Sequence, residues 1–443
     1  MEGNVSPQPS SPEILPQAFV DAPPQPTSPT KGRIDSIDLL RGIVMVIMML
    51  DHTRDFVHRD MLQGFDPTDL AHTNVPLFFT RWITHFCAPV FVFLAGTGSY
   101  LQLARGKSKR ELSRFLITRG LWLIVLEFTV IRFGVLLNID YSFLGMMQVI
   151  WVLGVSMIVL AGLIHLPLRI VAVFGVGMIL LHNLTDGFRV TGWQGPQSGV
   201  PGLGAKLWIL LHQAFEPLPV LWFFPSPMVF VIYPLIPWIG VMAAGYAFGA
   251  LYQWDAARRR RFLLTLGGVA TALFVILRFV DIYGDAVRWS RQSTLAFTVL
   301  SFLNTTKYPP SLLFLLMTLG PSLMLLAWFE SSTLKAATVS DSQRLFNRVR
   351  NVFVTFGRVP LFFYILQWYT AHFISVAVHL IAGRSVGWMF SAQAGPGSAP
   401  PDAGFGLPVV YACWILGVLM LYPLCKWFAG VKQRRRDWWL SYL

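Results

Sequence analysis

The sequence predicts an all-α fold in which about ten transmembrane helices form a polytopic integral membrane bundle. Hydrophobic residues make up 54% of the 443 residues and charged residues only 13%, whereas soluble domains carry about 25% charged residues. Several apolar runs approach or exceed the ~20 residues that cross a bilayer as a helix. Lysine and arginine gather in alternate connections between these runs, a pattern typical of membrane topology.

Ten apolar segments follow one another along the chain, and each is a candidate membrane span. Two further apolar stretches, 205–215 and 294–303, are too short to cross the bilayer, and we expect them to be interfacial or re-entrant. The candidate spans lie at 39–56, 77–104, 112–137, 143–164, 167–183, 226–252, 262–282, 310–329, 352–382 and 408–429.

The basic residues predict the orientation of these spans. If the N-terminus is cytoplasmic, the cytoplasmic connections hold about three times as many lysines and arginines as the outer ones. Both termini are therefore expected in the cytoplasm. The same pattern accounts for the net charge of +13. It argues against nucleic acid as a partner, because the basic residues occupy separate loops and do not form one surface.

Three regions differ in composition. Residues 1–32 are rich in proline and serine and lack the basic start and apolar core of a signal peptide, so we expect a disordered cytoplasmic tail. Residues 33–430 form the predicted transmembrane domain, and 431–443 a basic cytoplasmic tail. Three scattered cysteines predict neither a disulfide framework nor a zinc site.

Ionisable side chains in the first span are the strongest functional candidates, because such groups are costly inside a membrane. Arg41 and His52 are eleven residues apart, so they share a helix face about 16 Å apart along the axis. Asp38 and Asp55 join that face. A histidine suits proton transfer near neutral pH, and Asp55 or Asp51 is placed to orient its ring. The alternative is that these pairs only close the helix ends.

Further polar residues lie in the outer loop and in later spans. His72 lies in the loop after the first span, where simple solvation is the alternative to catalysis. Arg81 and His85 stand at i and i+4 in the second span, where a structural pair is the alternative. The early histidines show no tight ligand spacing, so no metal is expected. Additional polar candidates at or beside spans are Arg54, Gln148 and Lys307.

Several motifs resemble the bacterial relatives of heparan-alpha-glucosaminide N-acetyltransferase, and the resemblance covers nearly everything after residue 33. This family belongs to a wider set of transmembrane acyltransferases. Another branch of that set carries Arg-x10-His in its first span, which is the spacing of Arg41 and His52. The motifs are residues 33–42, Asp51-His52, 81–96, 307–311, 357–364 and 436–440.

The resemblance implies acetyl-CoA or another acyl-CoA as co-substrate on the cytoplasmic side and a donor tunnel through the helical bundle. It also implies a small-molecule or glycan acceptor on the outer side of a bacterial cytoplasmic (inner) membrane. The eukaryotic enzyme uses an outer-loop histidine, for which His72 is the nearest candidate here, paired with an asparagine that aligns with Asp51. Many relatives carry histidine where this chain has Gln367.

The combined interpretation is a membrane acyltransferase that moves an acyl group, expected to be acetyl, from CoA to a sugar amine or hydroxyl. His52 is the predicted general base with Asp55 orienting it, and His72 with Asp51 is the alternative. A homodimer is an open alternative to a monomer. The rival interpretation is a transporter or flippase whose buried charges line a path. Donor binding is assigned to Arg41 and Gln148, and acceptor binding to Arg54, Arg81, His85 and Lys307.

Overall fold

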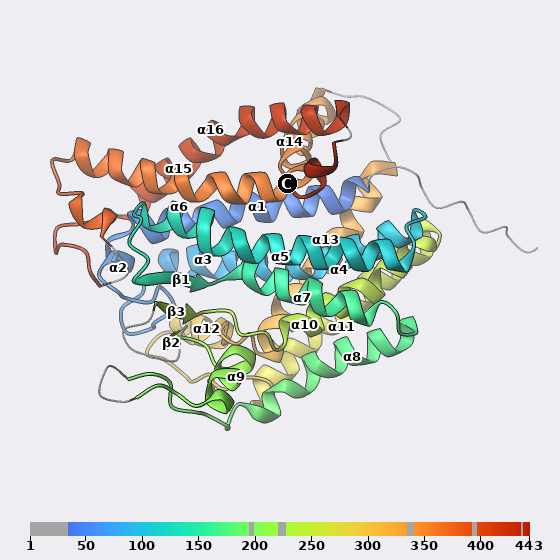
Figure 1. The fold of residues 1–443 in the computed structure, drawn as a ribbon, viewed down its shortest axis with the longest axis horizontal. Coiled ribbons are helices and arrows are strands. Elements are labelled where there is room, and N and C mark those ends of the chain that lie inside the picture. Colours follow the sequence, from blue (N-terminus) through green and yellow to red (C-terminus); the bar gives the residue numbers. More distant parts are fainter. Residues whose placement is uncertain (1–33, 195–198, 220–226, 335–340, 392–396, 436) are drawn as a thin grey trace, which may run out of the picture.

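The computed structural model describes residues 34–194, 199–219, 227–334, 341–391, 397–435 and 437–443. The tail predicted at 1–32 lies outside the described residues. The predicted helical bundle is present, with long helices running side by side (Figure 1). Six helical segments of the described chain are long and apolar enough to cross a membrane: Val75–Ala104, Leu168–Thr185, Ala256–Val280, Leu312–Glu330, Pro360–Ile381 and Leu407–Arg434.

Helix α1 (Asp35–Val57) is the central element of the bundle. Most of its residues are buried, because helices pack around it on several sides. A Cβ atom added at Gly42 would lie 1.8 Å from the carbonyl oxygen of Phe353, and one at Gly357 would lie 1.8 Å from that of Asp38. The α1 and α14 backbones therefore touch directly, as small residues allow. The neighbours of α1 are α4 (Cys87–Ala104), α13 (Leu312–Leu334), α14 (Asp341–Arg358), α15 (Pro360–Ile381) and α16 (Leu407–Arg434).

The remaining helices surround this centre in packed pairs, with α5 against α7, α10 against α4 and α8, and α11 against α13. Their bounds are α3 (Val75–Trp82), α5 (Lys109–Leu126), α6 (Arg132–Leu136), α7 (Val149–Leu163), α8 (Leu168–Leu181), α10 (Trp238–Phe248) and α11 (Ala256–Val280). Short helices are α2 (Arg59–Leu62), α9 (Leu203–His212) and α12 (Leu295–Leu303). Single turns are η1 (Ile83–Phe86), η2 (Glu127–Ile131), η3 (His182–Thr185), η4 (Gly249–Gln253), η5 (Gly387–Phe390) and η6 (Trp438–Ser441).

A three-stranded sheet corrects the all-α prediction. Its strands β1 (Phe143–Met147), β2 (Glu216–Pro219) and β3 (Met228–Val231) lie in the order β1-β3-β2. β1 pairs with β3 in parallel, and β2 pairs with β3 antiparallel. The sheet lies with α2, α9 and α12 toward the end of the bundle where α1 finishes (Figure 1, left). In the predicted topology this end is extracytoplasmic.

Strands and prolines also shift several predicted helix bounds. Strand β1 occupies the start of the segment predicted at 143–164, and β3 the start of that predicted at 226–252. A short apolar run fits a buried strand as well as a helix, so periodicity cannot separate the two. The segment predicted at 352–382 is divided near Pro360, the first residue of α15, because proline suits the start of a helix but not its interior.

The ten-span count stays a prediction. The other four candidate segments correspond to α1, α5–α6, α7 and α10. Each of these is too short or carries too many charged residues to be counted with the six. α1 and α5 carry several charged residues, whereas α7 has only 15 residues and α10 only 11. The two stretches predicted to be too short to span form the short helices α9 and α12.

Candidate functional site

A cavity of about 440 Å³ lies beside the first half of α1. Arg41, Met45 and Met48 line it from α1 at successive helical turns. Leu94 on α4, Ile150 on α7 and other apolar side chains form its inner wall. Six basic residues also line it and are here called the basic mouth: Arg41, Arg105, Lys107, Arg119, Arg358 and Lys432.

The basic mouth contains few opposing charges. Asp38 is the one acidic side chain among the described residues that line the cavity. Arg41 pairs with Asp38 at 3.2 Å and donates a hydrogen bond to the Gly357 carbonyl oxygen at 3.3 Å. Arg358 also lies 3.7 Å from Asp35, which is outside the lining. The six basic side chains still outnumber these two acidic ones, so the mouth favours an anionic ligand. The apolar inner wall favours an uncharged extension of the same ligand.

The C-terminal residues form part of the cavity wall. Helix α16 runs to Arg434, and Leu440 is buried beyond it. Ser441 and Leu443 line the cavity. The Tyr442 and Thr118 hydroxyls are 2.7 Å apart. The segment predicted as a basic tail at 431–443 therefore contacts α5 over the residues that the structure describes.

His52 lies one helical turn beyond the cavity. Met48 is the lining residue farthest along α1, and His52 follows it at i+4. On α15 the same step leads from Tyr364, which lines the cavity, to Trp368. The His52 and Trp368 rings pack against each other with their centroids 3.7 Å apart and their planes inclined by 38°. Between the cavity and His52, the amide nitrogen of the buried Gln367 donates a hydrogen bond to the Met48 sulfur at 3.2 Å.

Buried polar atoms without a protein partner gather in this region. Among the described residues, the Tyr364 hydroxyl, the Trp368 indole nitrogen and His52 Nδ1 make no hydrogen bond. Leaving such groups unpaired costs about 1–3 kcal/mol each. Buried polar groups normally have hydrogen-bond partners. The grouping of these three unpaired atoms therefore favours a site where a ligand or water provides the missing hydrogen bonds.

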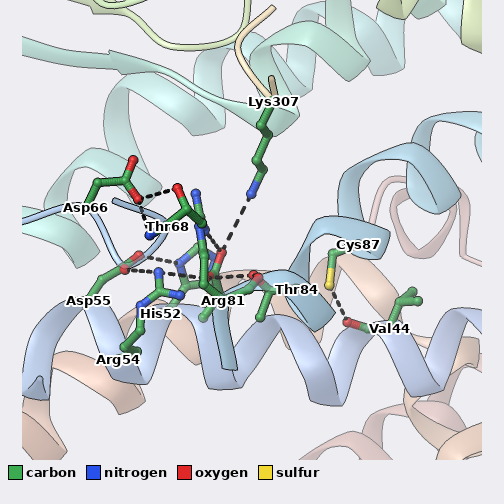
Figure 2. A network of polar contacts seen from close by, with 11 residues as sticks. Val44, His52, Arg54, Asp55, Asp66, Thr68, Arg81, Thr84, Cys87 and Lys307 are labelled. Atoms are coloured by element: carbon green, nitrogen blue, oxygen red, sulfur yellow. Dashed lines mark hydrogen bonds and ion pairs between the residues drawn. The ribbon is translucent and has the colours of Figure 1, made fainter. Parts of the chain in front are cut away.

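The charged cluster lies beside His52 toward the C-terminal end of α1 and consists of Asp51, Arg54, Asp55, Arg81 and Lys307 (Figure 2). Arg81 Nη1 donates to both Asp51 carboxylate oxygens at 2.8 Å. Arg54 Nη2 lies 2.7 Å from Asp51 and 2.6 Å from Asp55. Lys307 reaches toward Asp51 from a separate segment, with its Nζ 4.0 Å away.

Asp51 is the organising residue of this cluster. Besides Arg81 and Arg54, it accepts a hydrogen bond from the Thr84 hydroxyl at 2.9 Å. With its oxygens engaged in this way, Asp51 is poorly placed to accept a proton. The three cations of the cluster face two carboxylates, and only low fractions of Arg54 and Arg81 are exposed. This excess of positive charge in a buried site is suited to stabilising an oxyanion.

The ring of His52 is held chiefly by packing. His52 Nδ1 lies 3.8 Å from the nearer Asp55 oxygen, which exceeds hydrogen-bond length. Asp55 instead binds Arg54. Contact with the tilted Trp368 ring therefore holds His52 in this structure, and orientation by Asp55 stays a prediction. A movement of less than about 1 Å would restore the hydrogen bond.

The other predicted site residues lie apart from His52 or in different surroundings. His72 is exposed and bonds to Asp69, with Nδ1 and the carboxylate oxygen 2.7 Å apart. This bond lowers the pKa of Asp69. His85 is buried with its ring 5.3 Å from that of Phe314, and Arg81 bonds to Asp51 rather than to it. Gln148 precedes α7 beside a smaller pocket, while its neighbours line the main cavity.

Sequence reasoning missed several contributors to the site. Trp368 and Tyr364 are aromatic residues at helical spacing in an apolar segment, a pattern that equally describes core packing. Thr84 is a neutral hydroxyl that nothing in the sequence separates from others. Glu127 is a buried acidic residue that accepts the backbone N–H of Trp151 at 2.9 Å. Its carboxylate thus satisfies the start of α7, where backbone N–H groups need partners.

Comparison with known proteins places this site in a family. The family described as "Heparan-alpha-glucosaminide N-acetyltransferase, catalytic" matches residues 33–279. The match includes α1, the basic loop after α4 and all of the charged cluster except Lys307. No curated protein matches the chain. Because the match covers more than half of the sequence, the chain belongs to the heparan-alpha-glucosaminide N-acetyltransferase catalytic-domain family.

Proposed function

We propose that this protein is a membrane acyltransferase that transfers an acetyl group from acetyl-CoA, bound from the cytoplasm, to a sugar amine or hydroxyl on the outer side. One observation carries the proposal. The cavity has a basic mouth at Arg41 and extends along α1 to Met48, one turn short of His52. Phosphates suit the mouth, and the pantetheine arm suits the apolar interior. The thioester would then lie near His52.

The side chains near His52 supply the groups that acyl transfer needs. His52 takes a proton from the acceptor amine or hydroxyl as that atom attacks the thioester carbonyl carbon. The carbonyl oxygen becomes an oxyanion, which the positive excess of the charged cluster stabilises. Collapse of the tetrahedral intermediate breaks the carbon–sulfur bond, and the leaving CoA thiolate recovers the proton from His52. Arg81 and Lys307 are the cations that we assign to this step.

Donor binding is the direct test. Calorimetry of the detergent-solubilised protein with CoA should give saturable binding that weakens as salt rises, because phosphate contacts are screened. Arg41→Gln and Arg358→Gln should each weaken binding about 10-fold, since losing one charged hydrogen bond removes roughly 1.5–3 kcal/mol. Arg169→Gln is the control, because Arg169 is exposed at the start of α8 and outside the cavity lining.

Two outcomes would contradict the proposal. Absence of CoA and acetyl-CoA binding at millimolar concentration would remove the donor. Saturable uptake of a sugar into proteoliposomes, without acyl transfer from labelled acetyl-CoA, would favour the transporter. Acceptor identity follows from a panel of amino sugars and sugar alcohols assayed with the labelled donor.

A further inference from the structure

A second group of potential ligands lies at the end of the bundle that holds the sheet, in residues that the proposed reaction does not use. His182 begins the turn η3 after α8, and Asp186 follows that turn. His212 is the last residue of α9. One nitrogen or oxygen atom from each of the three lies within 4.8 Å of the other two.

The distances suit a tetrahedral metal ion. His182 Nδ1 and His212 Nε2 are 3.3 Å apart. Bonds of about 2.0–2.1 Å to a tetrahedral Zn²⁺ place ligand atoms about 3.3–3.4 Å apart. The nearer Asp186 oxygen lies 3.9 Å from His212 Nε2, so a small side-chain rotation completes a three-ligand set. A hydrogen bond between the two imidazoles is the competing explanation.

The surroundings hold these groups in a form that can bind a cation. His182 and His212 are 5% and 4% exposed, so bulk water competes little for their nitrogens. Asn183 donates to one Asp186 oxygen at 2.8 Å and leaves the other directed at His212. Such outer hydrogen bonds orient ligating carboxylates.

Space and local charge also permit an ion. Asp186 and His212 line a small cavity of about 70 Å³, together with Tyr308. This is enough room for a water as fourth ligand. The carboxylate of Asp186 supplies a negative charge at this cavity, which a bound cation would balance.

We propose that His182, Asp186 and His212 form a zinc site that joins the end of α8 to the end of α9. Two imidazoles and one carboxylate favour zinc-like transition metals over Ca²⁺ or Mg²⁺, which prefer oxygen ligands. The ion stabilises the wall of the small cavity that Tyr308 also lines, and Tyr308 directly follows Lys307 of the charged cluster. His212 lies 26 residues after Asp186, so no short ligand motif marks this site in the sequence.

The test uses the full-length protein in detergent after chelator treatment. Titration with Co²⁺ should give about one equivalent of binding with the visible absorption of tetrahedral cobalt, displaced by Zn²⁺. His182→Gln and His212→Gln should each weaken binding about 100-fold or more, and Asn183→Ala about 10-fold through the lost carboxylate contact. His165→Gln is the matched control, because His165 is exposed in the turn before α8 and this variant should bind as the wild type does.

The wild-type protein alone can overturn the proposal if a variant fails to fold. Absence of saturable Co²⁺ binding, or binding without the tetrahedral spectrum, would leave only the imidazole hydrogen bond. Unchanged affinity in His182→Gln, with a monodisperse profile in size-exclusion chromatography, would place the metal elsewhere. Zn²⁺ should also raise the melting temperature of the wild type and of His165→Gln, but not of His212→Gln. This outcome is independent of acyl transfer.

Discussion

Replacing His52 with glutamine should remove most acetyl transfer while leaving donor binding intact. A general base contributes about 10²–10⁴-fold, which corresponds to roughly 3–5 kcal/mol of the barrier. The structure separates this effect from donor affinity, because His52 lies eleven residues and thus about 16 Å along α1 from Arg41 in the basic mouth. The Kd for CoA should therefore change less than about 3-fold, while kcat falls by at least 100-fold.

The assay measures transfer from labelled acetyl-CoA to the best acceptor, with calorimetry of CoA binding on the same preparations. Glutamine retains most of the histidine volume, so packing against Trp368 should survive, and His165→Gln controls for loss of any histidine. Near-normal turnover in His52→Gln with an inactive His72→Ala would assign the base to the outer loop. If neither change slows transfer, neither of these histidines is the base, and Asp55 becomes the candidate because the Asp51 oxygens are already engaged.

Three further predictions concern stability and topology. Gly357→Ala should lower the melting temperature and destabilise the fold by about 1–3 kcal/mol or more, because the added Cβ would lie 1.8 Å from the Asp38 carbonyl oxygen. Gly177→Ala is the control and should not lower the melting temperature, because the space around Gly177 is open. Asp51→Asn should lower the free energy of unfolding by about 3–5 kcal/mol, because it leaves buried arginines without a counter-charge. A melting temperature within 1–2 °C of the wild type corresponds to about 1 kcal/mol at most and would contradict the role assigned to Asp51. Reporter fusions after Lys109, Arg260 and Arg435 should all report a cytoplasmic location. A single fusion that reports the outer side would overturn the ten-span topology.

Helical spacing places Arg41 and His52 on one face of α1, and their roles in the site stay predictions. Arg41, Met45 and Met48 line one cavity because α1 follows ideal helical spacing. Partners brought in by tertiary packing could not be predicted in this way. Trp368 is more than 300 residues from His52 in sequence, and Arg81 bonds to Asp51 rather than to its helical neighbour His85.

The sheet shows a second limit of sequence reasoning. Strands β1 and β3 are apolar runs of five and four residues, and both lie in segments otherwise long enough for a helix. The pairing of β1 with β3 depends on backbone hydrogen bonds between segments far apart in the chain. Hydrophobic periodicity within one segment carries no information about such pairing.

The continuous course of α1 has a consequence for the choice of donor. Arg41 and His52 belong to one unbroken helix, so their separation of about 16 Å cannot shrink when a substrate binds. Under the proposed reaction, a carrier that anchors its phosphates at Arg41 must be long enough to span that interval. Acetyl phosphate, anchored at the same arginine, would leave its acetyl group far short of the histidine. Donors with progressively shortened arms should therefore stop being turned over at a definite length, even when their phosphates still bind.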